Sequence, residues 1–202
     1  TIPHGLGVVP EMLVFKCTGG VQSWFILHKD LSSFTDRYLR YQTADAEITY
    51  TMQSQAPTST LLYLNSGGVS NAGAETICYA FASKTGYSKC ASYKGNGNSS
   101  GKGAFIYTGF KPSFILAKRI DNSSNGNWII WDNKRDGYNP NKALFPTSSA
   151  AEGAYATENI DIYSNGWKQK GASFGNSDGG TFIYYAVGQS LVASNGIPAT
   201  AR

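Results

Sequence analysis

Short apolar runs alternate with turn residues along nearly the whole chain. The runs are four to six residues long and rich in β-branched and aromatic side chains, which is typical of β-strands. They lie at residues 12–15, 24–27, 61–64, 76–81, 104–107, 114–117, 128–131 and 181–185. Asn-Gly and Asp-Gly dipeptides between them supply the positive φ angles that tight hairpins need. The pattern predicts an all-β protein with antiparallel hairpins.

Several of these runs are apolar at every position, which indicates strands that are covered on both faces. One segment, residues 31–41, spaces its apolar side chains as a helix would, at Leu31, Phe34, Tyr38 and Tyr41. It lacks strong caps, and residues 38–41 fit a strand equally well. Both readings of this segment stay open.

The two halves of the chain resemble each other. Residues 4–16 align with 107–118, residues 23–26 with 127–130, and residues 76–81 with 182–187. In this alignment Pro10 matches Pro112, Lys16 matches Lys118 and Trp24 matches Trp128. Order, spacing and residue type agree at three separate places, which favours an internal repeat.

The repeat predicts an antiparallel, jelly-roll-like β-sandwich built from two units. The first unit is expected at residues 1–94 and the second at residues 104–192, with a Gly/Asn/Ser linker or loop at 95–103 and a C-terminal tail at 193–202. Two arrangements fit the repeat equally well: two stacked sandwiches in tandem, or two units interleaved in one sandwich.

The composition narrows the class of protein. Charged residues make up 15% of the chain, against about 25% in an ordinary soluble domain, while there are 23 glycines and 13 tyrosines. This mixture fits an extracellular or virion surface better than a cytosolic enzyme. The net charge of +4 is scattered, and the densest basic groups, Lys118-Arg119 and Lys134-Arg135, fall short of a nucleic-acid-binding patch.

Cys17, Cys78 and Cys90 are the three cysteines. Their odd number and the absence of C-x-x-C spacing argue against a disulfide framework and a zinc site, so we expect small buried side chains and assembly in a reducing compartment. No run of 18 apolar residues is present, so membrane insertion is not expected. The chain starts at Thr1 without a visible signal peptide, and we interpret it as a piece of a longer polypeptide.

The sequence offers little catalytic chemistry. Residues 171–175 match G-x-S-x-G, but both histidines, His4 and His28, precede this segment, so it is interpreted as a loop. The few acidic residues form no recognisable pair for glycoside cleavage. We therefore expect no catalytic residues, no cofactor and no enzymatic activity. A weak oxygen-rich candidate for calcium, with a solvated loop as its alternative, consists of Asp132, Asp136, Asn139 and Asn141.

Aromatic residues near turns of the second unit are the remaining candidates for function. Trp24 and Trp128 match in the repeat and are expected in the core. A cluster of exposed rings at one end of the sandwich would make a glycan or protein contact surface. The candidates for this surface are Trp131, Tyr138, Tyr155, Tyr163 and Trp167.

A set of short motifs resembles a domain found in structural proteins of tailed bacteriophages. The motifs are HGLGVVPE at 4–11, SWFILHK at 23–29, GYSK at 86–89, SYKGNG at 92–97 and YTGFKP at 107–112. The resemblance covers residue 4 to about residue 189. It implies a virion location after assembly in the bacterial cytoplasm, repeated copies in an oligomer, and a role in structure or host contact. The resemblance identifies no catalytic or binding residues in this chain.

The resulting expectation is a domain of a tail fibre or spike that contributes to host attachment. Its expected partners are further copies of itself, as a homotrimer by analogy with fibres, other virion proteins, and a host-surface glycan or protein. Alternatives are a capsid decoration or head-fibre protein, a carbohydrate-binding module of a secreted protein and, least favoured, a glycan depolymerase.

Overall fold

The computed structural model describes residues 1–65, 75–99, 101–135, 139, 142–154 and 159–189. These residues form antiparallel sheets and contain no α-helix, and their one helical element is the 3₁₀ turn η2 (Phe174–Asn176). The predicted all-β class is therefore confirmed. In the segment with two open readings, residues 37–40 form a strand, β4 (Arg37–Arg40).

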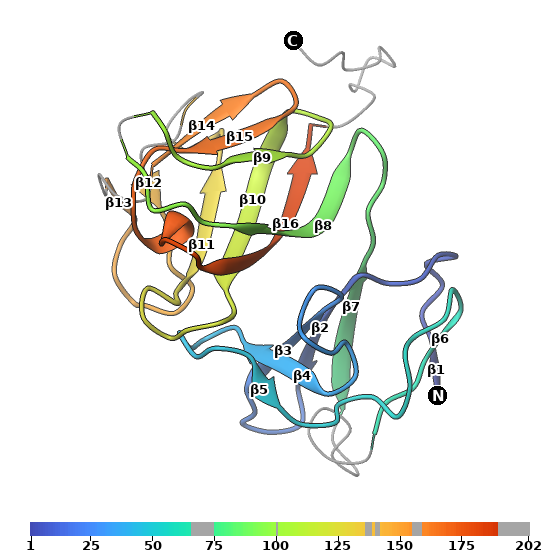
Figure 1. Cartoon of the computed structure of the whole chain (residues 1–202). Coiled ribbons are helices and arrows are strands. Elements are labelled where there is room, and N and C mark those ends of the chain that lie inside the picture. The colour runs from blue at the N-terminus through green and yellow to red at the C-terminus, as the bar shows by residue number, and fades with distance from the viewer. Residues whose placement is uncertain (66–74, 100, 136–138, 140–141, 155–158, 190–202) are drawn as a thin grey trace.

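The N-terminal part of the chain forms a five-stranded sheet, seen at the bottom of Figure 1. Its strand order is β5 (Ile48–Thr49), β4, β3 (Trp24–His28), β2 (Met12–Cys17) and β7 (Thr76–Phe81). A separate pair, β1 (Ile2–Pro3) with β6 (Leu61–Leu62), lies beside it.

The C-terminal part contributes two larger sheets. A four-stranded sheet has the order β11 (Trp128–Asp132), β10 (Pro112–Arg119), β16 (Thr181–Gly188), β8 (Ser88–Lys94). A three-stranded sheet has the order β14 (Ile160–Tyr163), β15 (Gly166–Gln169), β9 (Phe105–Tyr107), and lies at the top of Figure 1. The short strands β12 (Lys142–Ala143) and β13 (Gly153–Ala154) form a further pair.

The four-stranded sheet is the middle of three layers. Along β10, Ile115 and Ala117 point into a core shared with the three-stranded sheet, whereas Leu116 points into a second core shared with the five-stranded sheet. Strand β2 alternates in the same way, because Met12 joins this second core and Leu13 joins a third core on the far face. The apolar runs of β2 and β10 therefore belong to strands that are covered on both faces, as predicted for several runs, whereas β7 and β9 each leave one face exposed.

Strand register agrees with the predicted repeat. The matched segments occupy equivalent places, since β3-β2-β7 and β11-β10-β16 are adjacent in the same order within their sheets. Lys16 lies opposite Trp24, and Lys118 lies opposite Trp128. On the other side of each strand, Val14 of β2 lies opposite Tyr79 of β7. In the other sheet, Leu116 of β10 lies opposite Tyr185 of β16, as the alignment requires. This agreement supports an internal duplication.

The strand pairing departs from the predicted division of the chain at β8. This strand falls within the expected first unit, yet it pairs along its whole length with β16 of the C-terminal sheet. Asn96 and Asn98 of the predicted linker are also anchored to the second unit. The amide nitrogen of the fully buried Asn176 donates to Asn96 Oδ1, Asn98 O and Gly171 O, and the Asn176 side-chain oxygen accepts from the backbone N–H of Asn96.

Candidate functional site

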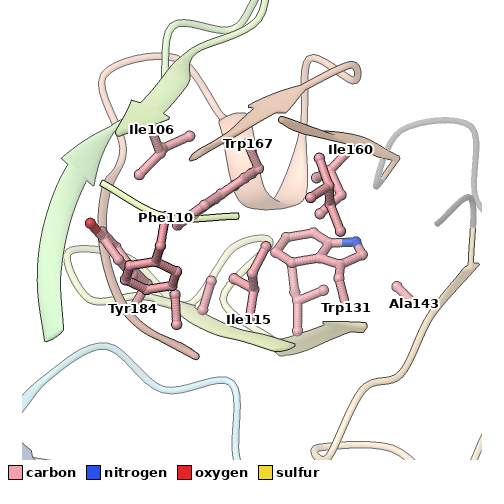
Figure 2. Packing of buried hydrophobic residues seen from close by; sticks show 12 residues of the cluster. Ile106, Phe110, Ile115, Trp131, Ala143, Ile160, Trp167 and Tyr184 are labelled. Atoms are coloured by element: carbon pink, nitrogen blue, oxygen red, sulfur yellow. The ribbon is translucent and has the colours of Figure 1, made fainter. Parts of the chain in front are cut away.

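Two of the predicted contact residues, Trp131 and Trp167, are core residues. Both side chains are 0% exposed, so their assignment to a contact surface is wrong. Strand alternation explains this result. Trp131 shares the inner face of β11 with Ile129, and Trp167 meets Tyr184 edge to face with ring centroids 4.8 Å apart. Figure 2 shows both indole rings among the aliphatic side chains of this core.

Tyr163 is the candidate that lies on the surface, with 41% of its side chain exposed. Tyr138 and Tyr155, the other two predicted contact residues, lie outside the described residues. Tyr163 ends β14 and points away from the core, because its neighbour Ile162 points inward.

Two further exposed rings join Tyr163 on the outer face of the three-stranded sheet. Phe105 and Tyr107 lie on β9, 48% and 59% exposed, on either side of the buried Ile106. The register places Tyr163, Gly166 and Tyr107 in one row across the three strands. The Phe105 and Tyr163 ring centroids are 5.8 Å apart in an edge-to-face arrangement. We refer to Phe105, Tyr107 and Tyr163 as the aromatic platform.

Gly166 makes the close packing of the platform possible. A Cβ atom built at this position would lie 2.1 Å from the backbone oxygen of Ile106 and 3.0 Å from Cζ of Phe105. Because Gly166 has no side chain, β9 can approach β15 closely, and the Phe105 ring can lie beside Gly166.

Replacing Gly166 with alanine should destabilise the protein by about 1–3 kcal/mol, because β9 must move away from β15 to admit the methyl group. Urea unfolding measures this loss. Gly20→Ala is a matched control for the general cost of adding a methyl group to glycine, because nothing lies within 4 Å of a Cβ built there and its φ is not in the left-handed region. An unchanged midpoint for Gly166→Ala would contradict the close approach.

Charged side chains border the platform. The Lys89 ammonium lies 5.3 Å from the centroid of the Tyr107 ring and donates to the Tyr107 carbonyl. Lys168 lies opposite Phe105 on the same outward face, with Asp161 opposite it on β14. Asp161 forms an ion pair with Lys170 at 3.4 Å. The platform thus combines flat apolar rings with nearby hydrogen-bond donors, which are the groups that hold a sugar ring.

The sequence interpretation missed Phe105 and Tyr107. The signal that would have found them is alternation, because residues 105–107 read aromatic, aliphatic, aromatic, so a buried Ile106 requires two outward rings. The pairing of β9 with β15 is not local, and the sequence did not place these rings beside Tyr163.

The oxygen-rich calcium candidate is only partly described. Asp136 and Asn141 lie outside the described residues. Asp132 accepts hydrogen bonds from Arg135 and from the Lys134 backbone, and these bonds hold its pKa below the usual value against the opposing effect of burial. Asn139 accepts from the backbone N–H of Ile162. Within the described part of the chain, no group of three or more His, Cys, Asp or Glu residues is placed to hold a metal.

An open cleft lies between the five-stranded and four-stranded sheets. This cleft has a volume of about 630 Å³, and its walls are mainly apolar. Trp24, predicted to be a core residue, lines it with 37% of its side chain exposed. The residues around the cleft are Met12, Val14, Trp24, Ile26, Tyr41, Gln42, Phe81, Phe114, Leu116, Pro146 and Tyr185.

The same two layers hold a buried histidine. His28 is 0% exposed, and its Nδ1 accepts the backbone N–H of Asp30, so Nε2 carries the proton and donates to the Tyr184 carbonyl at 3.3 Å. Burial lowers the pKa of His28 from 6.5 to about 4, partly opposed by the Asp30 carboxylate and the bond to Tyr184. The neutral ring is a structural link between β3 and β16.

The three cysteines are free thiols, and Cys17 and Cys90 are buried. Burial raises the pKa of the Cys78 thiol to about 12 and raises that of Cys90 as well, so neither is an activated nucleophile. Among the described residues, no helix has the length and apolar character needed to cross a membrane.

Comparison with known proteins yields one match. The family model described as "Domain of unknown function (DUF7483)" matches residues 1–190. No curated protein and no solved structure matches the chain significantly.

Proposed function

The chain belongs to the DUF7483 family of domains of unknown function, and we propose that it is a bacteriophage virion domain that contacts host-surface glycan. In this proposal the domain is part of a tail fibre or spike and acts by binding, without catalysis. The observation that carries the glycan contact is the aromatic platform, three exposed rings gathered on one sheet face around Gly166.

The chemistry of the platform suits a sugar better than an apolar partner. The exposed rings of Phe105 and Tyr163 offer apolar surface to the C–H groups of a pyranose, while Lys89 and Lys168 offer donors to its hydroxyl or carboxylate oxygens. The rings sit on a sheet that is held by its own core, so little ordering is needed when a ligand binds.

The assembly proposed from the phage resemblance would multiply this contact. A single platform of three rings gives weak affinity, and several copies displayed together on one fibre convert weak contacts into firm attachment. A homotrimer that exposes the outer face of each three-stranded sheet would meet this need.

Binding to an array of bacterial surface glycans tests the function. The wild-type protein should bind at least one glycan, and Tyr107→Ala and Tyr163→Ala should each weaken that binding about tenfold, which corresponds to about 1.4 kcal/mol. Tyr50→Ala is the matched control, because Tyr50 is 43% exposed and belongs to the N-terminal part of the chain. If the wild type and all three variants bound the glycan equally well, the platform would not be the glycan contact.

The virion location is tested separately. An antibody against this chain should label a fibre or spike of the source phage in electron micrographs. Labelling over the capsid would favour a decoration or head-fibre protein. Glycan binding without any labelled particle would favour the carbohydrate-binding module, and release of reducing ends from the bound glycan would establish a depolymerase.

A further inference from the structure

The duplicated sheets contain two equivalent Lys–Trp pairs with different surroundings. Lys16 and Trp24 are opposite one another on β2 and β3, and Lys118 and Trp128 are opposite one another on β10 and β11. The Trp128 side chain is 1% exposed, whereas that of Trp24 is 37% exposed. The same pair is therefore covered in one half of the molecule and open in the other.

A short segment of the chain covers the Trp128 pair. The Tyr41 ring packs on Trp128 with centroids 5.4 Å apart, and the indole Nε1 donates to the backbone carbonyl of Arg40 at 2.9 Å. Lys118 Nζ donates to the carbonyls of Ala44 and Asp45 at 3.3 and 2.7 Å. The Tyr41 ring thus packs against Trp128, and backbone carbonyls accept the hydrogen bonds that Trp128 and Lys118 donate.

The equivalent position in the other half carries a proline. Ile26 lies opposite Leu39, and the matched Ile130 lies opposite Leu144. Two residues beyond each leucine come Tyr41 and Pro146. Pro146 lines the cleft beside Trp24 but has no aromatic ring, so the space that Tyr41 fills in one half is left open as the cleft in the other.

The second pair also keeps donor capacity. Lys16 Nζ donates to the Gln22 carbonyl at 2.6 Å and lies 5.7 Å from the centroid of the Trp24 ring. A lysine ammonium has three donors, so further acceptors can bind beside the ring. Apolar walls, an exposed indole and a cation over its ring reproduce the chemistry that receives Tyr41 in the other half.

We propose that the cleft beside Trp24 is a docking site for a tyrosine-bearing segment of a partner polypeptide. The partner's ring packs on Trp24 between the two sheets. Backbone carbonyls or an acidic side chain next to that tyrosine accept from Lys16. This site is distinct from the aromatic platform and does not depend on glycan binding.

A peptide with the sequence of residues 39–45, LRYQTAD, blocked at both ends, is the probe. Trp128, Trp131 and Trp167 are buried, so Trp24 is the tryptophan that acrylamide quenches most readily. Increasing amounts of the peptide should reduce quenching in a saturable manner. The same peptide with alanine in place of tyrosine should have no effect, and equal protection by both peptides would overturn the proposal.

Three variants locate the site by equilibrium dialysis of the peptide. The Pro146→Tyr variant places a tyrosine ring of the chain itself in the cleft beside Trp24. It should therefore lower the acrylamide quenching of Trp24 and reduce peptide binding at least tenfold. Pro146→Ala should bind as the wild type does. Lys16→Met changes a side chain at the surface and should weaken binding about fivefold. Unchanged peptide binding in Pro146→Tyr and Lys16→Met would overturn the proposal.

Discussion

The Trp128→Ala variant should lose about 3–5 kcal/mol of unfolding free energy, the usual cost of removing a fully buried tryptophan. The indole fills the core between the five-stranded and four-stranded sheets, packs against Tyr41 and donates to the Arg40 carbonyl. Its loss leaves a cavity between two layers and removes one of the two donors to the Arg40 carbonyl, which also accepts from the backbone N–H of Thr43. Urea unfolding followed by circular dichroism measures the change.

Trp24→Ala is the matched control, since the repeat places Trp24 at the equivalent position of the other sheet. It should cost only about 1–2 kcal/mol, because its side chain is partly exposed at the cleft. Similar losses for the two variants would mean that the cleft beside Trp24 is closed in solution. They would also remove the basis of the docking site.

Acid should destabilise the protein through His28 by about 3 kcal/mol between neutral pH and pH about 4. The pKa of His28 is lowered from 6.5 to about 4 in the folded state, so the unfolded chain binds the proton first as the pH falls. Stability is therefore complete above pH about 6.5 and is lost as the pH falls through this window. Protonation places a second N–H on Nδ1, which faces the backbone N–H of Asp30.

The His28→Gln variant isolates this effect. Glutamine can still donate to the Tyr184 carbonyl but does not titrate. Glu11 and Asp121 have lowered pKa values and add to the acid loss, but they do so in both proteins. The difference in unfolding free energy between wild type and His28→Gln should therefore shrink or change sign toward pH 4. A difference that is constant from pH 7 to pH 4 would contradict a buried, neutral His28.

The fold class was predictable because strand signals depend on local sequence. Apolar runs at every position predicted two-sided burial, and β2 and β10 both contribute to two cores. The aligned segments also pair in equivalent registers, which is consistent with the predicted repeat. The placement of β8 was not predictable, since its partner β16 lies about 90 residues later in the chain.

The positions of exposed aromatic side chains were harder to predict than the fold. Trp131 and Trp167 were chosen because tryptophan suits contact surfaces, yet in this fold their size fills the core. Exposure depends on which sheet covers which face, and a single sequence does not give that information. Tyr163 was predicted as a contact residue because it lies near a turn, and its side chain is exposed. Its neighbours Phe105 and Tyr107 come from β9, more than 50 residues earlier.

The layered arrangement also bears on how freely the outer face of the three-stranded sheet can vary in sequence. The platform rings point outward from the three-stranded sheet, whose inner face carries Ile106, Ile162 and Trp167. The four-stranded sheet separates the platform from the five-stranded sheet. Substitutions at the three outward positions should therefore change the outer surface of this sheet with little cost to stability. If the platform binds a glycan as we propose, exchange of a few side chains alters which glycan is bound while the scaffold stays intact.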